Sequence, residues 1–249
     1  GASGGVTWFL NENDFFLTYA HSEFVTECAR RGDTIGVHDH IDFLNGRWEY
    51  EAIREFCARS HARVADALSR IAYARPLTAH RFGCFFQHAT AYRVVAELGY
   101  TICSELVPGV YHTNHTDLTS FDNREIPVGI RPFRHDASNF TEYSSRHGVF
   151  FHAPMVHSHL LADYWPQFSF SILDDWIEQA QKTSEHPIVV TLCFHPYEIL
   201  DIGSLSVDPK RLDHLGEICS RLSSEYSVEY VNIDDCQDRY EHFFEGGAT

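Results

Sequence analysis

The feature that most constrains this chain is a regular alternation of short apolar runs with longer segments of helical periodicity. Apolar runs begin near residues 6, 34, 77, 101, 149, 188 and 228, and amphipathic segments separate most of them. Strands that alternate with helices form parallel sheets, because each helix carries the chain back to the edge where the next strand begins. The pattern predicts an α/β fold, and about seven strand–helix units suit a distorted (β/α) barrel.

The amphipathic segments predict helices over residues 22–31, 49–73, 90–98, 171–182 and 209–222, with a short helix at the end of the chain. In the longest of them, Ile53, Cys57, Val64 and Leu68 recur at helical spacing. The run over residues 188–194 is the most apolar in the chain, which favours a central strand. Residues 105–147, rich in proline and polar side chains, predict an irregular insertion with room for two small strands. We expect a single domain over residues 1–249, because no linker, repeat or low-complexity segment interrupts the pattern.

The net charge of the chain limits the kinds of molecule that it can bind. The sequence holds 35 acidic and 19 basic residues, a formal net charge of −16. This balance argues against nucleic acid, which is bound through cationic side chains, and against anionic membrane surfaces. No apolar run reaches the length of a membrane span, so we expect no membrane insertion. Seven cysteines without a CxxC pair favour reduced, buried thiols, and we therefore expect a cytoplasmic protein.

A dense cluster of metal-competent side chains follows the second predicted strand. His38, Asp39, His40 and Asp42 fall within five residues at its end. Imidazole and carboxylate together are the usual ligands of zinc and similar divalent metals, and strand ends are where α/β enzymes place their chemistry. Because side chains alternate along an extended strand, His38 and His40 would share one face and Asp39 would point to the other. The plainer alternative is a pair of surface or hydrogen-bonded histidines.

Two further segments end predicted strands with polar groups. Residues 80–83 (His-Arg-Phe-Gly) follow the third strand, and residues 193–196 (Cys-Phe-His-Pro) follow the most apolar one. In a parallel barrel the carboxyl ends of all strands open at one mouth. We therefore expect His38, Arg81 and His195 to converge there, although more than a hundred residues separate some of them.

These segments resemble, in order, those of the polysaccharide deacetylase family, the carbohydrate esterases with the NodB homology domain. Residues 6–10 resemble the family strand A-T-F-F-V, and residues 32–38 resemble G-H-E-I-G-x-H, which bears the metal histidines. Arg81 stands where the family has its Arg-x-Pro motif. Residues 96–100 resemble the following L-G-Y, and residues 191–196 resemble the closing strand with the catalytic histidine. The resemblance covers about residues 6–200.

The resemblance implies a metal-dependent hydrolase that removes N-acetyl groups from a sugar or surface polysaccharide, such as a bacterial O-antigen or capsule precursor. It implies a divalent metal, with zinc favoured, held by His38 together with His40 or Asp42. It also implies that His195 protonates the departing amine and that Arg81 orients a base carboxylate. The plainer alternatives are a hydrogen bond from His195 to a backbone carbonyl and a surface ion pair for Arg81.

The chain departs from the family pattern at three points. Asp42 stands where the family has its second metal histidine, and Gly83 replaces the proline of the arginine motif. The family's paired aspartates, which precede the first strand and supply a metal ligand and the general base, are not found before residue 6. Asp234 and Asp235 follow an apolar run and are a candidate replacement. Two alternatives stay open: a catalytically degenerate sugar-binding relative, and a metallohydrolase of the amidohydrolase or PHP type, which also opens with a His-x-His pair.

Overall fold

The structure is a computed structural model of the chain. It describes residues 4–11, 22–44, 46–71, 73–112, 121–140, 142–143, 147–157, 168–183, 187–201 and 206–245. Within these ranges, only the backbone is described at residues 22, 42, 43, 112, 121, 200 and 245.

A six-stranded sheet forms the centre of the structure. Five of its strands run parallel, and β7 joins the edge antiparallel to β8. The strands are short and their side chains are mostly buried, as expected for a sheet covered on both faces. In spatial order they are β1 (Thr7–Asn11), β2 (Thr34–Asp39), β3 (Ala79–Phe82), β4 (Ile102–Cys103), β8 (Phe150–His152) and β7 (Phe133–His135).

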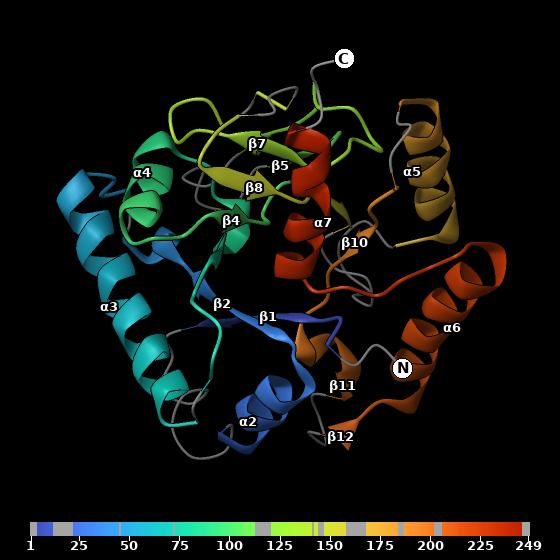
Figure 1. Cartoon of the computed structure of the whole chain (residues 1–249), viewed down its shortest axis with the longest axis horizontal. Coiled ribbons are helices and arrows are strands. Elements are labelled where there is room, and N and C mark those ends of the chain that lie inside the picture. Colours follow the sequence, from blue (N-terminus) through green and yellow to red (C-terminus); the bar gives the residue numbers. More distant parts are fainter. Residues whose placement is uncertain are drawn as a thin grey trace.

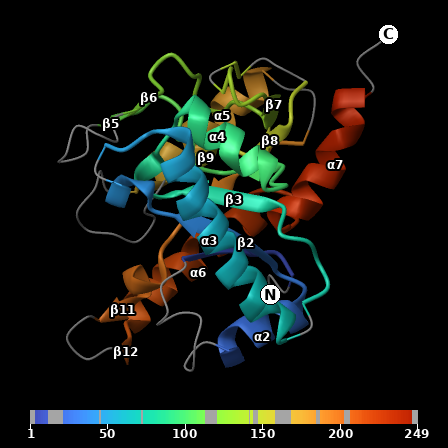
Figure 2. The same cartoon turned by 90° about the vertical axis from the view of Figure 1, so that its left-hand side faces the viewer.

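Helices cover the two faces of this sheet (Figure 1). On one face lie α2 (Ser22–Arg31), α3 (Tyr50–Ser69) and α4 (Ala89–Glu97), whose apolar sides form the larger core with β1 to β4 and β8. Figure 2 shows α3 lying across β2 and β3. On the other face, α7 (Ile233–Glu245) packs through Tyr240 against Phe151.

A second layer adjoins the face that α7 covers. There β9 (Met155–His157) and β10 (Thr191–Leu192) pair in parallel. The helices α5 (Phe170–Thr183) and α6 (Pro209–Glu225) pack beside them in a separate apolar core. Two antiparallel pairs complete the strands: β5 (Tyr111–His112) with β6 (Phe121–Asp122), and β11 (Leu200–Asp201) with β12 (Ser206–Val207).

The α/β class is confirmed, but the predicted barrel is not. Among the described residues the strands form one open six-stranded sheet and three separate pairs, and none of these closes into a ring. The predicted helices form within a few residues of their expected bounds. The described part of residues 105–147 is mostly irregular and includes β5, β6 and β7.

Two predicted strands differ from expectation. The apolar run over residues 188–194 contributes only β10, which pairs with β9 and lies outside the six-stranded sheet. Residues 228–232 form no strand, and α7 begins directly afterwards. Asn232 ends this run because its Oδ1 accepts a hydrogen bond from the backbone N–H of Asp235 at 2.9 Å, the geometry of a helix N-cap. The cap fixes the first residue of α7.

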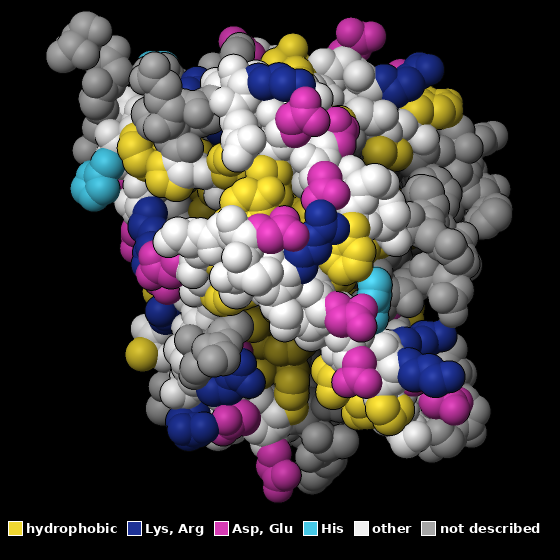
Figure 3. Space-filling model, turned by 90° about the vertical axis from the view of Figure 1, so that its right-hand side faces the viewer, with side chains coloured by type: hydrophobic (Ala, Val, Ile, Leu, Met, Phe, Trp, Pro, Cys, Tyr) yellow, Lys and Arg dark blue, Asp and Glu magenta, His cyan; other side chains and the backbone are white. Residues whose placement is uncertain are grey.

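None of the described helices is long and apolar enough to cross a bilayer. The side of the molecule shown in Figure 3 carries acidic and basic side chains interspersed with apolar ones, and its described part shows no continuous basic patch.

Candidate functional site

The candidate site is built first from the register between β2 and β3. His38 lies directly opposite Arg81 in this parallel pair. Their neighbours Val37 and Phe82 are fully buried in the core beneath α3. Because side chains alternate between the faces of a strand, His38 and Arg81 both point to the opposite face, toward β10. The guanidinium of Arg81 reaches the chain just after β10, where Nη1 donates to Sγ of Cys193 at 2.9 Å.

The chain bends between His38 and the residues that follow His40. The strand ends at Asp39, and the chain turns into the 3₁₀ helix η1 (Ile41–Leu44). The two imidazole rings meet edge to face, with centroids 4.7 Å apart. Asp42 lies within η1, but its side chain is outside the described residues.

Gly83 makes room for the ring of His40. A Cβ atom at residue 83 would lie 2.4 Å from Nδ1 of His40, far inside van der Waals contact. Gly83 opens the 3₁₀ helix η2 (Gly83–Phe85), in which Cys84 and Phe85 both adopt left-handed backbone conformations. The glycine that replaces the family's proline therefore has a steric reason in this chain.

His38 is held in one orientation by the backbone. Its Nδ1 lies 3.1 Å from the carbonyl oxygen of Arg81, so this nitrogen donates and Nε2 carries the lone pair. Burial lowers the pKa of His38 well below its usual value, and positive charge on His40, Arg81 and His195 lowers it further. The imidazole is therefore neutral near pH 7, which is the form that binds a metal ion.

Arg81 is not the surface ion pair considered as the plainer alternative. Its side chain is almost entirely buried, it donates to Cys193, and its guanidinium lies over the ring of Phe85 at 5.6 Å. The described residues give it no carboxylate to orient by direct contact. Burial raises the pKa of the nearby Glu105 carboxyl, and the positive charge of Arg81 offsets part of that rise.

His195 is fixed by a carboxylate that the sequence analysis did not single out. Oε1 of Glu198 lies 2.7 Å from Nδ1 of His195 and also accepts from its backbone N–H at 2.8 Å. Glu198 is buried in the 3₁₀ helix η3 (Pro196–Ile199), whereas 28% of the His195 side chain is exposed. The ring of Tyr197 stacks on the imidazole at 4.9 Å. The spacing His-Pro-x-Glu was the available signal, because a proline at the first position of a turn of helix brings residues three apart together.

The histidines from the two halves of the chain lie in one neighbourhood. His195 is close enough to His38 for its positive charge to lower the pKa of His38. Together with the contact between Arg81 and Cys193, this brings the end of β2, the end of β3 and the segment after β10 to the same place. The structure thus brings His38, His40, Arg81 and His195 into one region, and their roles stay predictions.

Asp39 and His80 take no part in this assembly, although both end predicted strands. Each sits one residue from a site residue and therefore points to the other face, beneath α3. There Oδ2 of Asp39 lies 2.8 Å from Nε2 of His80, and both side chains are buried.

Glu105 is a second functional candidate that sequence reasoning missed. It follows β4 at the same edge of the sheet, is fully buried, and accepts hydrogen bonds from the hydroxyl of Tyr92 and the backbone N–H of Ser104. Burial raises its pKa to about 7, against the lowering effects of Tyr92, His80 and Arg81. A carboxyl group that titrates near neutral pH is typical of functional sites, although buried structural networks also produce such shifts.

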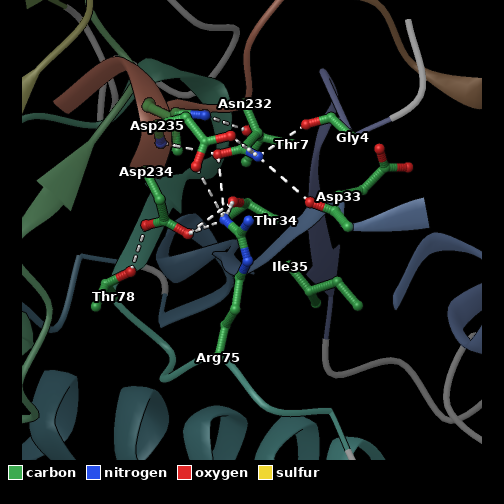
Figure 4. A network of polar contacts seen from close by, with 12 residues as sticks. Gly4, Thr7, Asp33, Thr34, Ile35, Arg75, Thr78, Asn232, Asp234 and Asp235 are labelled. Atoms are coloured by element: carbon green, nitrogen blue, oxygen red, sulfur yellow. Dashed lines mark hydrogen bonds and ion pairs between the residues drawn. The ribbon is translucent and has the colours of Figure 1, made fainter. Parts of the chain in front are cut away.

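The carboxylates of Asp234 and Asp235 do not replace the missing aspartate pair. Figure 4 shows them in the first turn of α7, in a network with Thr34, Thr78, Arg75 and Asn232. Asp234 accepts from the hydroxyls of Thr34 and Thr78 at 2.6 and 2.7 Å. Thr34 begins β2, whereas His38 lies near its end, so about four residues of extended chain, roughly 13 Å, separate the network from the imidazoles. The network ties the amino ends of the strands to α7.

Comparison with known proteins shows similarity in fold. No protein-family model matches the chain, and no curated protein matches it in sequence. Among solved structures, a protein from Mycobacterium smegmatis described as a "putative polysaccharide deacetylase" is similar, with a TM-score of 0.56 and 13% sequence identity. The similarity covers 94% of this chain and 70% of that one. Nearly the whole of this chain therefore has the fold of the corresponding part of that protein.

Proposed function

We propose that this protein is a metal-dependent hydrolase that removes N-acetyl groups from a sugar or polysaccharide. The observation that carries the proposal is the convergence of His38, His40, Arg81 and His195 at the carboxyl ends of the strands. This is the edge at which α/β enzymes bind and transform their substrates. The fold shared with the Mycobacterium smegmatis protein, whose description names a polysaccharide deacetylase, supports the same activity.

The imidazoles fit a divalent metal, with zinc favoured. The backbone carbonyl of Arg81 fixes Nδ1 of His38, so that Nε2 is presented as a ligand, and the ring of His40 lies edge to face beside it. Asp42, which follows in η1, would supply the carboxylate of the set. When bound, the metal would polarise the acetamide carbonyl and acidify a water molecule, which could then lose its proton to solvent before it attacks the carbonyl carbon.

The residues of the chain would handle the proton and the leaving group. An amide nitrogen cannot leave as an anion at neutral pH, so it must be protonated as the C–N bond breaks. His195 would act as this general acid through Nε2, because Glu198 holds Nδ1. Arg81 lies between the two histidine segments and contributes positive charge that stabilises the oxyanion of the tetrahedral intermediate. Tyr197, 43% exposed and stacked on His195, offers a face for a sugar ring.

A carbohydrate from a bacterial surface polysaccharide, such as an O-antigen or capsule precursor, is the substrate class we favour. The resemblance of residues 6–200 to the family is the support for this choice. A cytoplasmic location agrees with seven cysteines and no CxxC pair. We also propose that residues 1–249 act as one domain, because the similarity to the solved structure runs through 94% of them.

A non-catalytic sugar-binding relative is the second candidate. It is favoured by one observation: among the described residues, no carboxylate completes a three-ligand group with His38 and His40. Such a protein would keep the aromatic and polar groups of the site and bind the sugar without releasing acetate.

Acetate release decides between the two. The purified protein, loaded with zinc, is incubated with N-acetylated oligosaccharides, and acetate is measured together with the zinc content. We expect wild-type protein to release acetate, His38→Ala to lose both zinc at this site and activity, and His195→Ala to lose activity while retaining zinc. Wild-type protein that holds zinc and binds the oligosaccharides but releases no acetate would establish the binding relative instead. A fully active His195→Ala protein would refute the assignment of the acid.

A further inference from the structure

A second cluster of metal-competent groups lies buried on the opposite face of the sheet from the candidate site. Asp39 ends β2, His80 lies in β3, and Cys57 faces them from α3. The ligand atoms of these three residues all lie within 4.8 Å of one another. Each side chain is at least 99% buried. Among the described residues, this is the one group of three or more such side chains close enough to share an ion.

The cluster contains buried polar atoms that have no hydrogen-bond partner. Oδ1 of Asp39, Nδ1 of His80 and Oγ of Ser60 are all in this state. Ser60 follows Cys57 by nearly one turn of α3 and is fully buried on the same face of the helix. A buried polar atom without a partner costs about 1–3 kcal/mol, and an ion bound between Asp39 and His80 would remove this cost for both residues.

The chemistry of the three residues selects the species. Thiolate, imidazole and carboxylate in one group are the ligand types of zinc. Zinc bonds of about 2.0–2.3 Å place tetrahedral ligand atoms roughly 3.5 Å apart, within reach of the observed spacing after small side-chain rotations. A carboxylate and a thiolate together also cancel the charge of a divalent ion, which lets the site sit in an apolar core.

Contacts within the cluster and around it hold the ring of His80 in place. Nε2 of His80 lies 2.8 Å from Oδ2 of Asp39, and the ring of Tyr100 packs edge to face on His80 at 5.0 Å. The hydroxyl of Tyr100 in turn lies 2.9 Å from Nδ1 of His61 on α3. These contacts orient the ring of His80 and link it through Tyr100 to α3.

We propose that Asp39, Cys57 and His80 form a structural zinc site that fastens α3 to the carboxyl ends of β2 and β3. It is separate from the imidazoles of His38 and His40, which point to the other face of the same strands. The site does not depend on the proposed deacetylase activity. It would hold in place the strand ends from which His38 and Arg81 project.

Cobalt(II) substitution tests the proposal, because a thiolate bound to cobalt gives a near-ultraviolet charge-transfer band that imidazole and carboxylate do not give. Wild-type protein and the variants His38→Ala, Cys57→Ser and Cys103→Ser are loaded with cobalt, and the band and metal content are measured. Cys103 is the matched control, since it is a fully buried thiol of β4 in the same apolar core. We expect the band in wild type, His38→Ala and Cys103→Ser. Cys57→Ser should show no band and should bind one equivalent of metal less than wild type.

Two outcomes would overturn the proposal. One is cobalt-loaded wild-type protein without the band. The other is a band that survives in Cys57→Ser but disappears in Cys84→Ser. Sγ of Cys84 lies 4.0 Å from Nδ1 of His40, so this result would place the thiolate-bound cobalt in the candidate site. If Cys57→Ser does not fold, X-ray absorption of zinc-loaded His38→Ala protein answers the same question. A sulfur at about 2.3 Å from zinc supports the site, and a shell of nitrogen and oxygen alone refutes it.

Discussion

Nδ1 of His195 and Oε1 of Glu198 lie 2.7 Å apart, with the carboxylate buried and the imidazole partly exposed. The same oxygen accepts the backbone N–H of His195, so the side chain of Glu198 holds both the ring and the chain that carries it. The pair has the form of a general acid and the group that orients it, a pattern that recurs on unrelated folds.

Replacing Glu198 with glutamine should lower the rate of acetate release by about 10- to 100-fold, the usual effect of removing an outer partner of a functional histidine. The amide oxygen can still accept both hydrogen bonds, but the negative charge that stabilises the imidazolium is lost. Initial rates of acetate release from N-acetylated oligosaccharides measure the effect.

The chain provides a matched control in α6. His214 and Glu217 form a pair with the same three-residue spacing, 3.4 Å apart and partly or largely exposed. Glu217→Gln should leave the rate of acetate release unchanged. Equal effects of the two substitutions would contradict the orienting role of Glu198.

Gly83→Ala should disturb the candidate metal site through His40. The new Cβ would lie 2.4 Å from Nδ1 of the imidazole, so the ring must move or η2 must shift. We expect zinc affinity at this site to fall at least tenfold. Zinc competition with a chromophoric chelator measures the affinity, and circular dichroism confirms that the variant is folded.

Gly216→Ala serves as the control for this substitution. Gly216 lies inside α6 with no atom within 4 Å of a built Cβ, and alanine favours a helix over glycine by about 1 kcal/mol. This variant should bind zinc normally and unfold at slightly higher temperature. Unchanged zinc affinity in Gly83→Ala would show that His40 does not hold the ion.

Glu105 should make the protein less stable as the pH rises. Its pKa is raised from 4.5 to about 7 in the folded state, so the folded protein resists ionisation that the unfolded chain accepts. Its contribution is most favourable below about pH 4.5 and is lost as the pH rises to about 7, a difference on the order of 3 kcal/mol. Glu105→Gln should remove this loss, because the hydroxyl of Tyr92 can accept a hydrogen bond from the amide as well as donate to it.

Urea denaturation of wild type and Glu105→Gln at about pH 5 and about pH 8 isolates the effect. The difference between the two pH values removes contributions that both proteins share, such as the lowered pKa of buried His135. Glu178→Gln, at an exposed site on α5, should reproduce the wild-type pH dependence. The same dependence in Glu105→Gln would mean that Glu105 is ionised throughout.

Local patterns were enough to predict most elements. The helical spacing of Ile53, Cys57 and Val64 predicted α3, and the apolar run before His38 predicted β2. The prediction was wrong for residues 228–232, which find no partner strand among the described residues and run into the capped start of α7 at Asn232. It was also wrong for the central position of residues 188–194, because strand order depends on which edges pair across the whole chain.

The sequence by itself determined that polar groups would gather at the ends of β2, β3 and β10, since the residue types and the alternation of strand and helix are local properties. Only the tertiary structure decided which of them share a face. The pleat of the strands sends His38 and Arg81 toward His195, and sends their neighbours Asp39 and His80 beneath α3 toward Cys57. One residue of register separates the two clusters, and that register is set by burying Val37 and Phe82 in the core.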